Sequence, residues 1–171
     1  MPEARDGFQA CVRTPFATLG INATRTHVTG IRYLAPSVAA KAPPRNTIAF
    51  LACVQIQQYL EDPRYAFDLP LALSGTRHRL EVWEALQRIP AGKTRTYGEL
   101  ARELHSSPRA IGGACGANPL PLVVPCHRVI AARGRGTSRD QMVRIGGFMG
   151  TKSEGFEIGI KRWLLAHEGA L

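Results

Sequence analysis

A chain of 171 residues is long enough to form one ordinary domain, or two small ones that share a core. Hydrophobic residues make up 44% of it, and 22 Lys and Arg oppose 13 Asp and Glu for a formal net charge of +9, which excludes a disordered or acidic protein. This positive charge favours a polyanionic partner, with nucleic acid preferred over an anionic membrane. A positive charge that only keeps a small protein soluble would give the same composition.

The apolar segments and cysteine motifs that the sequence lacks predict the compartment of the protein and the state of its cysteines. It has no apolar run of the roughly 18 residues that a membrane-spanning helix needs, and no apolar stretch at its start that would serve as a signal peptide. We therefore expect a cytoplasmic protein outside the membrane. Four cysteines stand at positions 11, 53, 115 and 126 without a Cys-x-x-Cys pair, which predicts neither a disulfide framework nor a zinc finger, and we expect no metal.

The first part of the chain predicts a small sheet and one helix. Between Phe8 and Leu34, short runs rich in Val, Ile and Thr alternate with turn residues, which predicts two or three antiparallel strands. From Asn46, a predicted N-cap, apolar residues recur at helical spacing until Pro63 ends the pattern. The predicted buried stripe of this helix comprises Ile48, Leu51, Ala52, Ile56, Tyr59 and Leu60. The loop that follows predicts two parts, residues 1–75 and 76–171.

Three helices are predicted next. Leu80, Trp83 and Leu86 share one face of a helix that ends before Pro90. The sequence Thr96-Tyr-Gly-Glu is a capping box that opens a second, short helix, and Ser107 followed by proline is an N-cap that opens a third. Two short capped helices joined by a tight turn are a helix-turn-helix candidate.

The third helix has an apolar side and a bare side. Ala110, Ile111, Ala114 and Cys115 form the predicted apolar side, whereas Arg109, Gly112, Gly113 and Gly116 lie on the other. Each glycine costs a helix about 1 kcal/mol relative to alanine, so three of them indicate the close approach of a large, smooth partner. A nucleic-acid backbone or groove and tight packing against another helix remain equal alternatives here.

The residues best suited to chemistry follow a predicted apolar strand that begins at Asn118. Cys126 is succeeded by His127 and Arg128, and cationic neighbours favour the nucleophilic thiolate, although a lone cysteine is more often a buried packing residue. Adjacent side chains of a strand point to opposite faces, so Pro125 must break the strand, or a water must bridge, if His127 is to act as the base for Cys126.

The last predicted helix contains Ile160, Trp163 and Leu164 and closes at the glycine in position 169. Glu168 lies in its last turn, where the helix dipole disfavours an acid. A functional role would explain this placement, with Glu168 orienting His127 within a Cys, His, carboxylate relay. An exposed glutamate without a role is the alternative.

At this point the sequence resembles the O6-alkylguanine-DNA alkyltransferases. The resemblance rests on Pro125-Cys-His-Arg-Val, on Asn118-Pro and Arg109-Ala-Ile-Gly-Gly before it, on Tyr97-Gly-Glu-Leu-Ala, and on Arg162-Trp-Leu-Leu-Ala-His-Glu-Gly. It is specific from about residue 75 onward and holds only in outline before that. It implies an α+β fold, with a small N-terminal antiparallel sheet plus helix that is ribonuclease H-like and a mostly helical, winged-helix-like C-terminal part.

The resemblance also implies an activity. The protein would act as a monomer, without a cofactor, on double-stranded DNA that contains O6-alkylguanine, and would move the alkyl group irreversibly to its own Cys126. His127 would take the thiol proton through a water, Glu168 would hold His127, and Asn118 would stabilise the active-site turn. Tyr97 would assist phosphate rotation and donate a hydrogen bond to the departing base.

Further roles are implied for DNA binding and for the substrate pocket. Arg109 would enter the duplex and replace the flipped nucleotide, while the third helix would lie in the minor groove. The DNA-binding set implied is Tyr97, Ser107, Arg109, Gly112, Gly113 and Gly116, and the pocket set is Val129, Phe148, Met149 and Gly150.

The sequence departs from the family's pattern after the cysteine. Residues 133–147 lengthen the usual turn and carry four of the nine basic residues that lie from Lys93 to Arg144, and residues 151–155 form a further insert. The family's Tyr-Ser-Gly or Phe-Ser-Gly loop is Phe148-Met149-Gly150. Met149 can replace the serine if its backbone N–H is what matters, but a lost hydroxyl would change the substrate preference.

Two alternatives from other classes remain at this point. A protein of the same fold that binds alkylated DNA without reacting would not need the nucleophile that Cys126 supplies. A thiol hydrolase using Cys126, His127 and Glu168 would leave the DNA-binding features unexplained, and no oxyanion-hole motif is visible.

Overall fold

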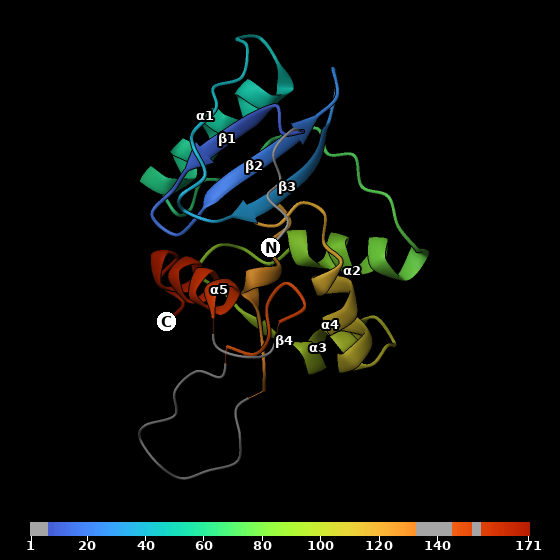
Figure 1. Ribbon diagram of the computed structural model, residues 1–171. Coiled ribbons are helices and arrows are strands. Elements are labelled where there is room, and N and C mark those ends of the chain that lie inside the picture. Colours follow the sequence, from blue (N-terminus) through green and yellow to red (C-terminus); the bar gives the residue numbers. More distant parts are fainter. Residues whose placement is uncertain (1–6, 133–144, 152–154) are drawn as a thin grey trace. The chain divides into compact units, whose positions relative to one another are not determined.

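The chain forms two compact units, Met1–Leu73 and Ser74–Leu171. The computed structural model describes residues 7–132, 145–151 and 155–171 (Figure 1). Most of the predicted inserts, residues 133–144 with their four arginines and residues 152–154, lie outside the described residues. Among the helices of the described part, none has the length and apolar character needed to cross a membrane.

The first unit contains the predicted antiparallel sheet, which has three strands. They are β1 (Ala10–Arg13), β2 (Thr18–Ala23) and β3 (Val28–Leu34), hydrogen-bonded in that order. The sheet is tightly packed at its centre, since a Cβ on Gly20 would lie 2.8 Å from the Phe8 ring. Leu19, Ile21 and Ile31 are buried and supply much of the core of this unit.

Helix α1 (Ile48–Glu61) packs along one face of this sheet (Figure 1). Its N-cap is Thr47, whose hydroxyl accepts from the N–H of Phe50. The prediction of Asn46 was wrong, because Asn46 adopts a left-handed conformation (φ 62°) just before the cap. The predicted stripe is also shifted: Leu51 is exposed, and the residues that are buried are Ala49, Ala52, Gln55, Ile56 and Tyr59.

The second unit begins with α2 (Arg77–Gln87), which is capped by Thr76. Trp83 is buried, and its indole N–H donates to the carbonyl of Ala114 at 2.9 Å, so that α2 is tied to a later helix. Leu80 is 38% exposed and does not belong to the predicted buried face, because that face is narrow and is filled by Val82, Trp83 and Leu86.

The predicted helix-turn-helix pair is present. In α3 (Tyr97–Glu103), Thr96 and Glu99 form the capping box, and α4 (Pro108–Gly116) starts after the N-cap Ser107. Between them the backbone N–H of Ser106 bonds to Ala101 O at 2.8 Å while His105 takes the left-handed conformation (φ 47°), which closes α3 tightly. The assignment of Ala110 to the buried side was wrong, because it lies in the exposed first turn of α4.

The continuous strand predicted from Asn118 does not form. Proline cannot donate to a strand ladder, and Pro119, Pro121 and Pro125 interrupt this segment. It runs instead through turns, with Leu122 left-handed (φ 77°), into the 3₁₀ turn η1 (Cys126–Arg128). Only β5 (Val129–Ile130) is a strand, and it pairs in parallel with β4 (Arg95–Thr96).

The chain closes with α5 (Phe156–His167). Its C-cap is Glu168, and Gly169 follows in the left-handed conformation (φ 71°) that the predicted glycine stop requires. The N–H of Ala170 completes this cap by donating to Leu165 O at 2.8 Å. The cap therefore fixes the direction in which the Glu168 side chain leaves the helix.

The link between α2 and α4 gives a first prediction. Replacing Trp83 with Phe should lower the free energy of unfolding by about 2–4 kcal/mol, because the Ala114 carbonyl loses its donor and the smaller ring leaves a cavity. Urea unfolding followed by circular dichroism measures the change. Leu80→Ala on the same helix is the control, with an expected loss within about 1 kcal/mol. Equal losses in the two variants would contradict the prediction.

Candidate active site

Cys126 occupies the first position of η1, where the chain changes direction. Pro125 before it has φ −81° and ψ 66°, which ends the extended run, as the sequence requires if Cys126 and His127 are to act together. The turn is held by bonds from the N–H of Cys126 to Val124 O and from the N–H of Arg128 to Pro125 O. Cys126 is 2% exposed and lines the wall of a pocket.

A buried ionic network stands behind this turn. His127 Nε2 lies 2.8 Å from Glu168 Oε1, with both side chains fully buried. Arg128 donates to the same carboxylate through Nε (3.0 Å) and Nη2 (2.9 Å), and through Nη1 to Ile89 O (2.6 Å). The backbone N–H of Gly92 also points at Glu168 Oε2, at 3.4 Å. Glu168 is therefore a buried partner of His127, and the alternative of an exposed glutamate is wrong.

The network sets the protonation of its members. Burial opposes ionisation of Glu168, but hydrogen bonds from His127 and Arg128 outweigh it and hold the pKa of this carboxyl well below its ordinary value. Burial lowers the pKa of His127, and Glu168 only partly offsets that effect. A neutral imidazole that donates from Nε2 to a carboxylate carries its lone pair on Nδ1. His127 Nδ1 is buried and has no hydrogen-bond partner among the described residues, so it is available to accept a proton.

The Cys126 thiol is protonated at rest. Burial raises its pKa, while hydrogen bonding from Asn118 and the nearby Lys161 ammonium oppose the rise. Asn118 is itself buried and braces the turn before the cysteine: Nδ2 donates to Val124 O at 2.8 Å and Oδ1 accepts from the N–H of Leu120 at 3.0 Å. These contacts brace the turn before Cys126, where the resemblance implies a stabilising role for Asn118.

Two residues of this site were missed by sequence reasoning. Arg128 was noted only as a cation beside the thiol, although its position after His127 on a tight turn was the available signal. Lys161 is fully buried, and its Nζ donates to Val129 O at 2.5 Å and to Gly147 O at 2.9 Å. Burial lowers its pKa to about 8. Its spacing from Ile158 and Leu164 places it on the apolar stripe of α5, which could have identified a buried lysine.

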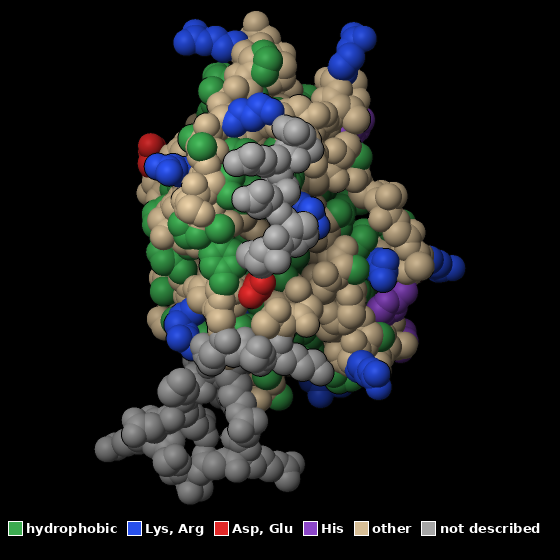
Figure 2. All heavy atoms as spheres, in the orientation of Figure 1, with side chains coloured by type: hydrophobic (Ala, Val, Ile, Leu, Met, Phe, Trp, Pro, Cys, Tyr) green, Lys and Arg blue, Asp and Glu red, His purple; other side chains and the backbone are tan. Residues whose placement is uncertain are grey.

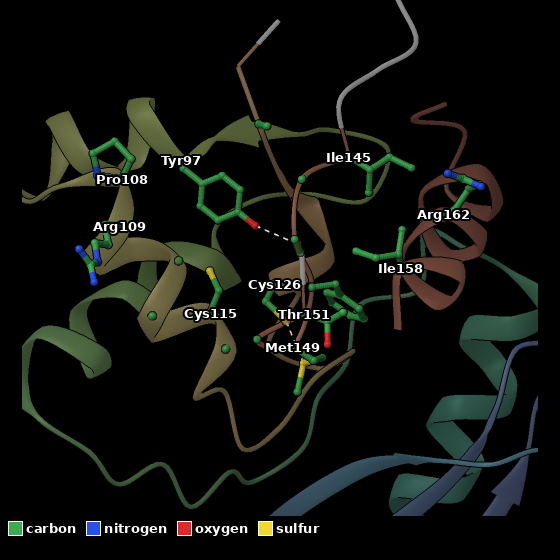
Figure 3. Close-up of a pocket in the computed structure, with 18 of the residues that line it drawn as sticks. Tyr97, Pro108, Arg109, Cys115, Cys126, Ile145, Met149, Thr151, Ile158 and Arg162 are labelled. Atoms are coloured by element: carbon green, nitrogen blue, oxygen red, sulfur yellow. Dashed lines mark hydrogen bonds between the residues drawn. The ribbon is translucent and has the colours of Figure 1, made fainter. Parts of the chain in front are cut away.

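Tyr97, the first residue of α3, forms part of the pocket wall near the thiol. Its hydroxyl donates to Gly147 O at 3.1 Å (Figure 3). Lys161 Nζ lies 5.7 Å from the centre of the Tyr97 ring. Burial, with a contribution from the neighbouring Cys115 and Cys126, raises the pKa of Tyr97. The phenol therefore stays protonated at neutral pH and serves as a hydrogen-bond donor.

The pocket has a volume of about 1440 Å³, enough for a nucleobase and its substituent. In Figure 3 the sulfur atoms of Cys115, Cys126 and Met149 lie in its central part, while Arg109 and Arg162 lie at opposite edges. Val129 does not line it; this residue is buried, and its carbonyl accepts from Lys161. Among the implied site residues, those that line the pocket are Tyr97, Arg109, Gly112, Gly113, Gly116, Cys126, Phe148, Met149 and Gly150.

The three glycines of α4 divide between the two explanations left open by the sequence. A Cβ on Gly116 would lie 3.3 Å from the backbone nitrogen of Gly150, so this glycine permits close internal packing. A Cβ on Gly113 would meet nothing within 4 Å, and one on Gly112 would only touch the Tyr97 ring at 4.0 Å. Gly112 and Gly113 thus leave a smooth surface next to the exposed Arg109, whereas Ser107 is occupied in capping the helix.

The described residues form a basic surface on the face drawn in Figure 2, where Lys and Arg side chains are spread over the surface and outnumber Asp and Glu. No group of three or more His, Cys, Asp and Glu side chains within the described ranges is placed to hold a metal ion.

Comparison with known proteins is consistent with this geometry. Residues 77–170 match the family described as 6-O-methylguanine DNA methyltransferase, DNA binding domain. A DNA base-flipping protein of Thermus thermophilus is 40% identical over 145 residues, covering 83% of this chain and 88% of that protein. The inducible methylated-DNA–protein-cysteine methyltransferase of Bacillus subtilis is 46% identical over 83 residues, covering 47% of this chain and 46% of that protein, about half of each.

A solved structure extends the likeness to both units. Mycobacterium tuberculosis OGT in complex with DNA is 32% identical with a TM-score of 0.72, covering 94% of this chain and 91% of that one. A second structure, of the O6-methylguanine methyltransferase of the same organism, has a TM-score of 0.71 at the same identity and coverage. The chain belongs to the 6-O-methylguanine DNA methyltransferase family.

Proposed function

We propose that this protein repairs DNA by transferring an alkyl group from O6 of guanine to Cys126, once per molecule. The observation that carries the proposal is the thiol of Cys126 in the pocket wall, followed in the chain by the buried His127. The Nδ1 atom of His127 is free to accept a proton, and its Nε2 atom is held by Glu168. A carboxylate that fixes the imidazole tautomer and stabilises the imidazolium is the arrangement that activates a nucleophile through a neighbouring base.

The proposed reaction is a displacement at the alkyl carbon. The thiol proton passes to His127, through a water where the two groups are not in direct contact, and the Sγ–C bond forms as the C–O6 bond breaks with its electron pair staying on the oxygen. Tyr97 donates a hydrogen bond to the departing base, and the Lys161 ammonium favours the developing thiolate. The thioether product has no good leaving group, so the reaction ends there.

DNA recognition is proposed for α4. The exposed Arg109 and the open backbone of Gly112 and Gly113 form one side of the pocket mouth, where a duplex could approach closely in its minor groove. The base must leave the stack to reach Cys126, at a cost of a few kcal/mol, and an inserted arginine offsets part of that cost. A monomer without a cofactor suffices, because the described residues supply the nucleophile, the base and the donor.

The finer fold assignments are also proposed. The three antiparallel strands with α1 support a ribonuclease H-like first unit. The contacts of α2 and α3 with α4, and the β4–β5 pair beside them, support a winged-helix-like second unit. A cytoplasmic location is proposed on the sequence alone.

One observation favours a second function. The Thermus thermophilus relative that spans most of this chain is named for base flipping and not for alkyl transfer. A protein that only binds and flips the lesion would share the pocket and α4. Cys126 and its ionic network distinguish the two functions, because binding alone needs neither a nucleophile nor a base.

Transfer to the cysteine is tested by stoichiometry. An oligonucleotide with one O6-methylguanine should lose its methyl group to the peptide that contains Cys126, with activity ending after one equivalent, as mass spectrometry of the digest will report. Cys126→Ala should abolish transfer and keep duplex affinity. Cys53→Ala, in the first unit, is the control and should react as the wild type does. Repeated turnover, or binding without transfer by the wild type, would contradict the proposal.

The role of the buried carboxylate is tested by a pH profile. Because burial lowers the pKa of His127 from its ordinary value, the transfer rate should be constant from about pH 6.5 up to about pH 8, where Lys161 begins to lose its charge, and should fall below about pH 6.5 as His127 becomes protonated. Glu168→Gln removes the group that raises the pKa of His127, so the fall should move to lower pH while the rate drops about 10²–10⁴-fold. Glu84→Gln, at an exposed glutamate, should change neither. An unchanged profile in Glu168→Gln would contradict the relay.

Arg109 is tested by comparing two substrates. Arg109→Ala should slow repair of duplex DNA by about tenfold or more, since the cost of unstacking is no longer offset, and should leave the reaction with free O6-alkylguanine nearly unchanged. Arg77→Ala, which removes one exposed positive charge elsewhere in the second unit, is the matched control. Equal losses on both substrates would exclude the inserted side chain.

A further inference from the structure

Met149 lies directly against the reactive thiol. Its Sδ is 3.9 Å from Cys126 Sγ, which is van der Waals contact between two sulfur atoms and leaves no room for a carbon between them (Figure 3). Both residues line the same pocket. None of the roles implied for the family's serine at this position explains a bulky thioether beside the nucleophile.

The turn that carries Met149 imposes this position. Phe148 and Thr151 exchange two backbone hydrogen bonds, of 2.8 and 2.9 Å, around a two-residue turn formed by Met149 and Gly150. Both central residues have positive φ, 49° for Met149 and 84° for Gly150. A turn of this kind favours Asn, Asp or Gly at its first central position. Met149 is thus kept in a backbone conformation that is unfavourable for methionine. Backbone strain of this sort at a ligand pocket points to a functional role for the residue.

The turn cannot move away from the thiol easily. The carbonyl of Gly147, just before it, accepts from both Tyr97 Oη (3.1 Å) and Lys161 Nζ (2.9 Å). On its other side Gly150 lies so close to α4 that a Cβ on Gly116 would be 3.3 Å from its nitrogen. With the backbone held at both ends, only the side-chain torsions of Met149 are left to make space beside Cys126.

We propose that Met149 determines the size of the alkyl group that Cys126 accepts. A methyl carbon reaches Sγ after a small rotation of the flexible thioether, whereas a bulky, rigid group such as benzyl requires Met149 to leave its place altogether. The bonds made and broken are those of the proposed transfer, on which this inference rests. Met149 is a specificity-determining residue, since it reads the group attached to the reacting carbon without taking part in the proton transfer.

The test compares two oligonucleotides, one with O6-methylguanine and one with O6-benzylguanine. In Met149→Ala the ratio of the benzyl to the methyl rate constant should rise at least about tenfold over the wild type, which is the discrimination that the space of one methylene provides in a pocket. Met149→Leu is the matched control: it keeps the volume without the sulfur, so its ratio should stay near that of the wild type.

A second variant guards against an altered fold. Met149→Gly removes the side chain and also suits the positive φ, so it should raise the ratio as Met149→Ala does while retaining the thermal unfolding midpoint. A ratio unchanged in both the Ala and Gly variants, or raised equally in Met149→Leu, would overturn the size argument. A wild-type protein that transfers neither group to Cys126 would instead refute the proposed function, so the two failures are distinguishable.

Discussion

The second unit depends on one buried carboxylate. Glu168 accepts from His127 and twice from Arg128, and it receives the backbone N–H of Gly92 at a longer distance. An unpaired carboxylate in this position would cost several kcal/mol, so these partners have to be present together. They come from η1 and from the loop after α2, while Glu168 itself caps α5. One side chain therefore joins three segments and sets the tautomer of His127, the proposed base.

The electrostatics of the site keep the Cys126 thiol in its protonated, unreactive form in the absence of substrate. Burial holds Cys126 and Tyr97 in their protonated forms and His127 in its neutral form. Lys161, with its pKa lowered to about 8, remains mostly charged at neutral pH and lies close enough to Cys126 for a thiolate to raise that pKa. The positive charge thus stabilises the thiolate only as it forms. This arrangement suits a protein that must react once and at the right base.

The glycines of α4 show how one helix meets two demands. Gly116 allows the Met149 turn to approach the helix from inside, whereas Gly113 leaves the outer surface bare. Substitutions at the two positions would therefore fail for different reasons, one by pushing the turn that covers the thiol and the other by roughening the surface beside Arg109. Gly116 therefore serves internal packing against a turn, while the bare surface at Gly113 is left for the partner that the proposed function assigns to it.

Local signals in the sequence determined most of the elements. The capping box at Thr96, the Ser107-Pro108 start of α4 and the glycine stop at position 169 were correct because they depend on neighbouring residues only. The strand expected before Cys126 was wrong because its apolar composition was given more weight than its prolines. Asn46 was misread as a cap because a turn residue and an N-cap look alike without backbone angles.

The sequence by itself therefore determined most of the helices, the helix-turn-helix pair, the run Cys126-His127-Arg128 as the candidate for chemistry and, through its resemblance, the family. Only the tertiary structure decided that Glu168 meets His127 across 41 positions, that Lys161 reaches two carbonyls from a buried face, and that Met149 rests against the thiol. The physical reason is that caps and turns are local, whereas ion pairs and buried contacts join segments far apart in the chain, and their partners are fixed only when the apolar faces of the helices pack.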